Sequence, residues 1–436
     1  MIRKAARGLP QPLVKRTSDT TCRVQAPRPP QAGRPRGRVL VVAPQPFYTE
    51  RGTPIAVRYV LEALSQLGFE TDVLTFPLGC DIRIPGMRLI RIADPLRTRS
   101  VPVGFSVRKL IFDSFMLASL ARQLRRRDYV CVHAVEEGAL LALLARGPRR
   151  GPLIYDMASS LPEQLTQKPL FRCAPLQALF NRIEGYMLRR ASVVVCSAGL
   201  ADHVRALAPE ALLREWRFPS AVRETTPKEV ADLRRDLGLA KDAPVVLYTG
   251  NFAEYQGIGL LFDAIPQVVR EMPGASFVLV GAANRTEIDA AYGRLPESVR
   301  AGVRCIERQS RDRIAAFIAM ASILISPRSY GGNFPLKVFD YLAAGKPIVA
   351  TDVPSHRVVL DDSLAVMVEP NPDGFAGGII RALEDKELAA SLTAATRQFA
   401  SRELSWPRFV ALIEEIYALA LEPEPPEVTP NGTKAG

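Results

Sequence analysis

Several common functional signatures are missing from this sequence of 436 residues, and each absence excludes a class of protein. No GxGxxG follows the first apolar strand, whose loop holds the single glycine Gly52. A nicotinamide- or flavin-dependent dehydrogenase therefore loses most of its support. No GxxxxGK[ST] occurs either, since Lys346 is followed by Pro347 rather than by Ser or Thr. This absence excludes a P-loop NTPase.

Cysteine and histidine are scarce, with six and three residues respectively. The cysteines show no CxxC spacing and several lie within apolar runs, which favours reduced, buried thiols in a cytoplasmic protein over a disulfide framework. Without paired Cys and His spacing, we expect no metal site. The sequence also lacks a signal-peptide core and any run of about 18 apolar residues. We therefore expect a cytoplasmic protein without a spanning helix, whose membrane contact is at most peripheral and on the inner face.

The formal net charge of +12 is unevenly distributed along the sequence. Residues 1–38 contain ten Lys or Arg and one Asp, residues 39–222 are also basic, and the remainder is slightly acidic. A basic first half favours an anionic partner such as phospholipid headgroups, a phosphate-bearing substrate or nucleic acid. Nucleic acid is the weakest of these, because the basic arm has no interleaved aromatic residues. An ordinary solvated, arginine-rich surface explains the charge equally well.

Short apolar strands alternate with helical stretches, and this alternation starts twice, at RVLVVAP and again at APVVLYTGN. Such a βαβ rhythm is typical of a parallel sheet, and a polar, proline-bearing linker over 217–242 separates the two series. The sequence therefore predicts an α/β protein with two doubly wound, Rossmann-like domains facing across a cleft. The expected parts are a disordered basic arm over 1–38, a first domain over 39–222, a second domain over 223–400, a closing helix over 401–421 and a disordered tail over 422–436.

Open parallel sheets bind ligands beyond the carboxyl ends of their strands, so the loops there hold the candidate residues. After the first strand, Gly52 and Thr53 supply a flexible loop, free amides and a hydroxyl that suit a phosphate or a sugar. A simple tight turn is the alternative interpretation. In the second half, Gly250 and Asn251 end a strand, and Gln256 precedes a helix whose first N–H groups suit an anion.

Two cations, Arg328 and Lys337, flank a second glycine-bearing loop. That loop contains Gly331, Gly332 and Asn333. Cations beside a loop that exposes its backbone suit a diphosphate, and the glycines permit close approach of a ligand. Asp340, three residues after Lys337, suits the hydroxyls of a ribose.

The stretch PLKVFDYLAAGKPIVATDVP is the most specific of four that resemble GT-B-fold, retaining glycosyltransferases of family 4. The others are VVLYTGNFAEYQGIGLLFDA, HAVEEGA and RRDLGL, and the similarity extends roughly over residues 38–420. The resemblance implies that the second domain binds a nucleoside diphosphate sugar, with Asp340 on its ribose, and that the first domain binds the acceptor. The family's basic pair is replaced here by Asn251 and Gln256, and a family glutamate by Gly332. We therefore expect Arg328 and Lys337 to supply the missing positive charge and to act in catalysis.

In the first domain, His133 matches a family histidine near the donor sugar. The resemblance implies that it bonds a sugar hydroxyl or stabilises charge at the reacting carbon, and a purely structural histidine is the alternative. Glu136 and Glu137 follow it, and Asp156 ends another predicted strand. These three carboxylates are the candidates on the acceptor side.

The resemblance implies a hexosyl or related transfer to a glycan or lipid-linked acceptor in bacterial envelope polysaccharide biosynthesis. Retaining enzymes of this kind need no protein nucleophile, since the site stabilises the departing diphosphate. We expect no metal and no other cofactor, which agrees with the absence of a DxD motif. Two alternatives stay open: a nucleotide-sugar epimerase of the same fold, and a catalytically inactive GT-B-like binding subunit of a membrane-associated glycan assembly complex, favoured by the lost charges.

An amphipathic stretch over 105–129 contains three consecutive arginines near its end. Its broad apolar stripe favours a crossover helix packed on the sheet over a helix lying on a membrane. The arginines at its end still suit anionic lipid.

Overall fold

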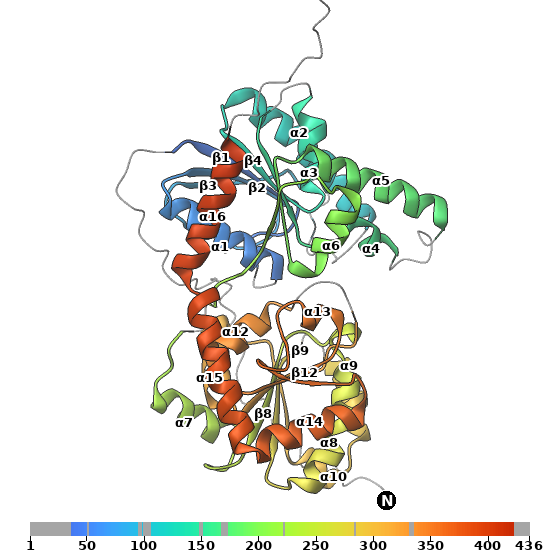
Figure 1. Cartoon of the computed structure of the whole chain (residues 1–436), viewed down its shortest axis with the longest axis vertical. Coiled ribbons are helices and arrows are strands. Elements are labelled where there is room, and N and C mark those ends of the chain that lie inside the picture. The colour runs from blue at the N-terminus through green and yellow to red at the C-terminus, as the bar shows by residue number, and fades with distance from the viewer. Residues whose placement is uncertain are drawn as a thin grey trace, which may run out of the picture.

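The protein folds into two α/β domains, each built on a parallel sheet (Figure 1). In this computed structural model the described residues are 36–49, 52–94, 98, 106–147, 151–166, 173–220, 223–282, 285–330 and 335–422. The predicted basic arm lies almost wholly outside these residues, as does the predicted tail. Their disorder therefore stays a prediction.

The first sheet has seven parallel strands in the order β3-β2-β1-β4-β5-β6-β7. The strands are β1 (Arg38–Ala43), β2 (Glu70–Thr75), β3 (Met87–Arg91), β4 (Cys131–Val135), β5 (Leu153–Met157), β6 (Val193–Cys196) and β7 (Leu213–Glu215). Every residue of β4, β5 and β6 is buried, because helices cover both faces of a parallel sheet. The apolar runs of the first half thus form the middle of this domain.

Helices cover the two faces of the first sheet. On one face lie α2 (Val107–Arg126), α3 (Gly138–Arg146), α4 (Leu161–Thr166), α5 (Ala174–Arg190) and α6 (Ala198–Leu207). On the other lie α1 (Gly52–Gln66) and α16 (Trp406–Leu421). The amphipathic stretch forms α2, whose Phe112, Met116 and Leu120 are fully buried against the sheet. The predicted crossover helix is therefore confirmed.

The second sheet has six parallel strands in the order β10-β9-β8-β11-β12-β13. The strands are β8 (Val245–Thr249), β9 (Ser276–Ala282), β10 (Val303–Glu307), β11 (Ile323–Ser326), β12 (Ile348–Thr351) and β13 (Val366–Val368). The remaining helices are α7 (Pro227–Asp236), η2 (Glu254–Gln256), α8 (Ile258–Glu271), α9 (Arg285–Arg294), α10 (Glu297–Arg300), α11 (Arg311–Met320), α12 (Lys337–Ala344), α13 (Pro354–Arg357), α14 (Pro372–Glu384) and α15 (Lys386–Glu403). Both halves are thus doubly wound, as the rhythm of the sequence predicts.

The predicted linker contains a helix, α7, that the polar composition of the segment concealed. Thr226 and Glu229 form a reciprocal capping box, and Pro227 occupies the first turn. These are strong signals for the start of a helix. Leu233 is the buried residue of α7, and the helix packs against α11 of the second domain.

The last helix returns from the second domain to the first, as the red segment of Figure 1 shows. Helix α15 ends at Glu403, and the Ser405 hydroxyl caps the start of α16. Trp406 Nε1 donates a hydrogen bond to Gln66 Oε1 of α1 at 2.7 Å. Aromatic side chains from both domains meet here: Phe218 contacts Tyr59 of α1, Phe339 of α12 and Phe409 of α16. The hydrophobic core therefore continues from one domain into the other.

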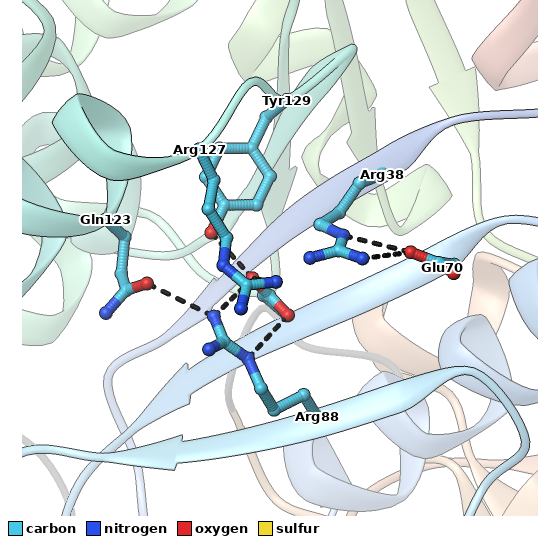
Figure 2. A network of polar contacts seen from close by, with 7 residues as sticks. Arg38, Glu70, Arg88, Gln123, Arg127 and Tyr129 are labelled. Carbon is cyan, nitrogen blue, oxygen red and sulfur yellow. Dashed lines mark hydrogen bonds and ion pairs between the residues drawn. The ribbon is translucent and has the colours of Figure 1, made fainter.

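Helix α2 is fastened to the sheet at both ends. Near its last turn the buried carboxylate of Asp72 pairs with Arg88 and accepts a hydrogen bond from Tyr129 Oη at 2.7 Å. Figure 2 shows this network, in which Arg88 also donates to Gln123 of α2. In the first turn, Lys109 Nζ lies 2.5 Å from Glu137 Oε1. The helix therefore holds a fixed position relative to the carboxyl edge of the sheet.

Cys80 differs from the expectation for cysteine. It is disulfide-bonded, whereas Cys131, Cys173, Cys196 and Cys305 are free. The expectation of reduced thiols is therefore wrong for Cys80.

Within the described residues, no helix combines the length and apolarity needed to cross a bilayer.

Strand order places the functional edge of each sheet. The order reverses direction between β1 and β4 in the first sheet and between β8 and β11 in the second. Open α/β sheets bind ligands beyond the carboxyl ends of strands at such reversals. The loops after β1, β4, β8 and β11 are therefore the places where a site is expected.

Candidate active site

Lys337 is the first residue of α12, and its side chain reaches back to the end of β8. Its Nζ lies 4.0 Å from the centre of the Tyr248 ring and donates a hydrogen bond to Gln256 Oε1 at 3.3 Å. Burial lowers the pKa of Lys337 well below its ordinary value, and the positive charge of Arg328 lowers this pKa further. The ammonium therefore lies in a place that favours added negative charge.

Arg328 follows β11 and is almost fully buried, with 5% of its surface exposed. Its Nε donates to the carbonyl oxygen of Tyr330 at 2.9 Å, and its guanidinium lies 5.2 Å from the centre of the Tyr255 ring. These contacts hold the guanidinium close enough to Lys337 to affect its pKa. The structure thus brings together the two cations that sequence reasoning selected.

Glycines allow the backbone to approach Lys337 after β8. Gly250 has a φ of +143°, and a Cβ there would lie 2.9 Å from Tyr248 Oη and 3.5 Å from Lys337 Nζ. Gly257, with a φ of +69°, caps α8, and a Cβ there would overlap the carbonyl oxygen of Pro327. Both positions require glycine, because other residues rarely adopt these backbone angles and have no room.

The two neutral residues that replace the family's basic pair have defined partners. Asn251 accepts from the Ala253 N–H at 3.2 Å and donates to Tyr255 Oη at 3.2 Å, so it shapes the turn. Gln256 is buried and its Oε1 accepts from Lys337. The amide thus orients the lysine instead of carrying a charge itself.

Asp340 lies one turn into α12 with its carboxylate engaged by two residues that the sequence did not indicate. Arg311 Nη2 lies 3.2 Å from Asp340 Oδ1, and the Ser220 hydroxyl donates to the same oxygen at 3.2 Å. Ser220 belongs to the segment that joins the domains, and the Arg311 guanidinium lies 5.6 Å from the ring centre of Tyr59 in the first domain. The proposed ribose carboxylate is therefore at the junction of the domains.

Gly52 and Thr53 begin α1, and this end of the first domain meets α12. A Cβ on Gly52 would lie 3.8 Å from Leu336 Cδ1, next to Lys337. The structure thus places the start of α1 beside Leu336, the residue that precedes Lys337. The predicted loop residues Gly331, Gly332 and Asn333 lie outside the described residues.

On the first domain, Glu136 and Glu137 follow β4, as predicted. Glu136 Oε1 accepts from the Ser159 hydroxyl at 3.0 Å, and both glutamates line a small cavity with Tyr155 and Ser159. Burial raises the pKa of Glu137 to about 7, although Lys109 opposes the shift. The arrangement offers two half-buried carboxylates and a buried hydroxyl at the carboxyl edge of the first sheet.

His133 and Asp156 lie in the interior instead of at the edge. His133 is 1% exposed, with Nδ1 2.9 Å from Tyr417 Oη of α16 and Nε2 3.6 Å from Asp156 Oδ2. Asp156 also accepts from Trp216 Nε1 at 2.7 Å. Both residues are within strands and face α16, so these contacts do not support a sugar contact for His133 or an acceptor contact for Asp156.

Sequence reasoning missed the aromatic and histidine side chains that surround the cations. Tyr248 and Tyr255 face Lys337 and Arg328, and His356 lies in α13. The aromatic residues of VVLYTGNFAEYQG have no motif of their own. Tyr248 lies in the continuous apolar run of β8, which indicates burial and no more.

Two doubly wound, Rossmann-like domains with a buried cationic site at the carboxyl edge of the second sheet are the arrangement of the GT-B fold. The family model "Glycosyl transferase 4-like domain" matches residues 51–215, and the model "Glycosyl transferases group 1" matches residues 243–385. The two models together match most of the chain, which is therefore a family 4-like GT-B glycosyltransferase.

Relatives support this assignment over most of the chain. A phosphatidyl-myo-inositol mannosyltransferase of Mycolicibacterium smegmatis is 24% identical over 385 residues, which is 87% of this chain and 93% of that protein. The sucrose-phosphate synthase of Thermosynechococcus elongatus superposes with a TM-score of 0.71 at 20% identity, covering 88% of this chain and 98% of that one. Anabaena Alr3699/HepE in complex with UDP-glucose superposes with a TM-score of 0.67 at 17% identity, covering 88% and 99%. The protein is thus similar in sequence and fold to glycosyltransferases.

Proposed function

We propose that the protein transfers a sugar from a nucleoside diphosphate sugar to a glycan or lipid-linked acceptor, with retention of configuration. The observation that carries this proposal is the pair of buried cations, Arg328 and Lys337. Like charges held together in a buried site repel each other, and an anion bound beside them relieves that repulsion. A diphosphate has the charge and the size to do so. The Anabaena structure with UDP-glucose supports the choice of donor class.

Four groups of residues contact the donor in this proposal. Lys337 and Arg328 hold the diphosphate, and Asp340 accepts hydrogen bonds from the ribose hydroxyls in place of that from Ser220. The backbone at Gly250 and Gly257 permits close approach of the phosphates. Gly52 and Thr53, at the start of α1, cover the diphosphate from the first domain.

The chemical step needs no protein nucleophile. The acceptor oxygen forms a bond to the anomeric carbon on the face from which the diphosphate departs, as the bond from that carbon to the phosphate oxygen breaks. The hydroxyl proton of the acceptor passes to the departing diphosphate. Lys337 and Arg328 stabilise the negative charge that develops on this leaving group. The configuration of the product, read by NMR from the anomeric proton, tests retention.

We propose that the two cations replace a metal ion at the diphosphate. The expected result is that EDTA leaves the transfer rate unchanged, while Lys337→Met reduces it by at least about 100-fold. A rate that falls with EDTA and returns with Mg²⁺ contradicts this part of the proposal.

The acceptor occupies the edge of the first domain beside Glu136 and Glu137. Carboxylates and the Ser159 hydroxyl suit the hydroxyl groups of a sugar or an inositol. Lys109 of α2 fixes Glu137, so the first turn of α2 borders this site. The mannosyltransferase relative, named for a phospholipid acceptor, favours a lipid-linked acceptor and a role in the bacterial envelope.

We propose a peripheral contact with anionic membrane through the outer face of α2, α3 and α5, which pack in a row. Five of the eight exposed large hydrophobic residues in the described chain lie on these helices: Leu110, Phe115, Leu144, Leu179 and Tyr186. Seven arginines of the same helices are exposed: Arg108, Arg122, Arg125, Arg126, Arg182, Arg189 and Arg190. The described acidic residues of these helices, Asp113 and Glu184, are half-buried and buried. An apolar face with positive charge only suits anionic lipid on the inner face of the membrane.

Titration calorimetry with UDP, GDP and ADP tests the donor class first. We expect at least one of them to bind with micromolar affinity, and transfer or hydrolysis of the matching nucleotide sugar to follow. If none of the three binds at millimolar concentration, the proposed function is wrong. Turnover that Lys337→Met abolishes also excludes an inactive binding subunit, and product analysis without acceptor separates transfer from epimerisation.

A further inference from the structure

His356 is a fully buried histidine that no part of the proposed reaction uses. It lies in α13, directly after β12, and has an exposed fraction of 0%. It contacts Thr351, which is hydrogen-bonded to the backbone of Arg328, so it neighbours the proposed diphosphate site. A fully buried histidine needs hydrogen-bond partners for its ring nitrogens, and these partners indicate its role.

The hydrogen bonds of His356 define its tautomer and its role. Nδ1 lies 2.7 Å from the carbonyl oxygen of Thr351. Because a carbonyl only accepts, Nδ1 carries the proton. Nε2 then accepts from the Ser326 hydroxyl at 2.9 Å. The neutral ring therefore joins the last residue of β11 to the last residue of β12.

This connection continues to the backbone of Arg328. The Thr351 hydroxyl donates to the Arg328 carbonyl oxygen. Ser326, bonded to the other side of the ring, lies two residues before Arg328 in the chain. Ser326, Thr351 and His356 are all fully buried, so solvent does not compete for these bonds. Two hydrogen bonds, from His356 to Thr351 and from Thr351 to Arg328, thus fix the backbone of Arg328.

We propose that His356 is a positioning residue that sets the location of the Arg328 backbone and so of its guanidinium, which rests on the proposed role of Arg328 in holding the diphosphate. Charge stabilisation depends steeply on geometry, and residues behind a ligand commonly change affinity by about 10- to 100-fold when removed. The ring does this without carrying charge, since a third cation would compete with the two that face the donor.

Two substitutions of His356 separate positioning from simple packing. His356→Leu removes both hydrogen bonds, whereas His356→Gln keeps an N–H donor for Thr351 and an oxygen acceptor for Ser326. We expect the leucine variant to bind the nucleoside diphosphate about 10-fold more weakly, with KM raised more than kcat is lowered. The glutamine variant is expected to remain within about threefold of the wild type. Equal affinity in the leucine variant and the wild type overturns the proposal.

A double-mutant cycle with Arg328→Met tests whether His356 acts through Arg328. We expect His356→Leu to cause no further loss of affinity on the Arg328→Met background, and full additivity overturns the proposal. Thr351→Val, which removes the donor to the Arg328 carbonyl but leaves the ring, is expected to reproduce the loss if the leucine variant does not fold.

Thr396→Val is the matched control. It removes a fully buried hydroxyl in α15 that donates within its own helix, to Leu392. We expect it to lower the melting temperature without changing nucleotide affinity. A comparable affinity loss in this control assigns the effect of His356 to stability and overturns the proposal. Absence of nucleotide binding by the wild type is a distinct result, because it removes the proposed function itself.

Discussion

At the residue scale, the surroundings of a side chain decide its role more than its type does. Lys337 and Lys346 lie nine residues apart, and burial lowers the pKa of both. Lys346 donates to the carbonyl oxygens of Ala319 and Ala321 at 2.9 and 2.6 Å, so it completes the end of α11. Lys337 makes one hydrogen bond among the described residues, to Gln256, and faces a tyrosine ring. The first lysine is structural, and the second is placed to bind an anion.

Acid is expected to destabilise the second domain through His356. Burial and the neighbouring cations Lys337 and Arg328 lower the pKa of His356 to about 4, from 6.5, while the hydrogen bond to the Thr351 backbone and the charge of Asp352 oppose the shift. The unfolded chain therefore binds more protons between these values, and stability falls as the pH drops from 6.5 towards 4. The loss amounts to about 3 kcal/mol at the acid limit. Thermal unfolding at pH 7 and pH 4.5 measures it. The acid-dependent loss should shrink in His356→Gln, and an equal loss in this variant contradicts the assignment.

Removing the Tyr417 hydroxyl is expected to affect stability and not catalysis. Tyr417→Phe leaves His133 Nδ1 without its partner in α16, which costs about 1–2 kcal/mol. Urea unfolding measures this cost, and the donor KM is expected to stay within about twofold of the wild type. A tenfold rise in KM contradicts a purely structural role for His133 and favours the predicted sugar contact.

At the element scale, α2 borders the proposed acceptor site and also forms part of the proposed membrane surface, and it is fixed at both ends. The Asp72 network of Figure 2 holds its last turn, and the pair of Lys109 and Glu137 holds its first turn beside the proposed acceptor site. A helix fixed in this way presents Leu110 and Phe115 outward without rearrangement. A lipid-linked acceptor can then enter the site from the surface on which the helix lies.

Removing the exposed apolar residues of α2 is expected to weaken membrane binding. Leu110 and Phe115 are 49% and 38% exposed, and Leu110→Ser with Phe115→Ser is expected to reduce binding to vesicles containing phosphatidylglycerol by at least about tenfold. Co-sedimentation measures the bound fraction. Leu212→Ser, which removes another exposed leucine outside these helices, is the control and should bind like the wild type. Equal binding of the double variant refutes the proposed surface.

At the scale of the whole molecule, the junction between the domains includes Asp340, the proposed ribose-binding carboxylate. Ser220 of the connecting segment and Arg311 of α11 both engage Asp340, while Phe218 packs against Phe339, the preceding residue of α12. Occupation of Asp340 by a ribose therefore changes contacts at the junction. Donor binding and the relative position of the domains are linked by this geometry.

Ser220→Ala is expected to strengthen donor binding. It removes a hydroxyl that occupies the Asp340 carboxylate in the absence of donor, and one such hydrogen bond corresponds to about 2- to 10-fold in affinity. Calorimetric titration with the preferred nucleoside diphosphate measures the change. Weaker binding by this variant contradicts competition between Ser220 and the ribose.

The fold was largely predictable from the sequence, whereas the site was predictable only in part. Apolar strands alternating with helices required two parallel sheets, and the loops after β1, β4, β8 and β11 followed from that. The interior positions of His133 and Asp156 could not be predicted, because every residue of a strand covered on both faces is buried, so the pattern does not say which side chain reaches an edge. Their partners Trp216 and Tyr417 come from distant segments. The hydrogen bonds that connect His356 to Arg328 likewise depend on the pairing of β11 with β12, which no local pattern reveals.

The central claim is that Lys337 and Arg328 hold the diphosphate of the donor, and calorimetric titration of Lys337→Met with the preferred nucleoside diphosphate tests it most directly. Methionine keeps the length and apolar body of the side chain and removes its charge. We predict that affinity falls by at least about 30-fold, while Lys346→Met, which removes a buried lysine of the same domain, leaves it unchanged. Equal affinity of Lys337→Met and the wild type contradicts the account.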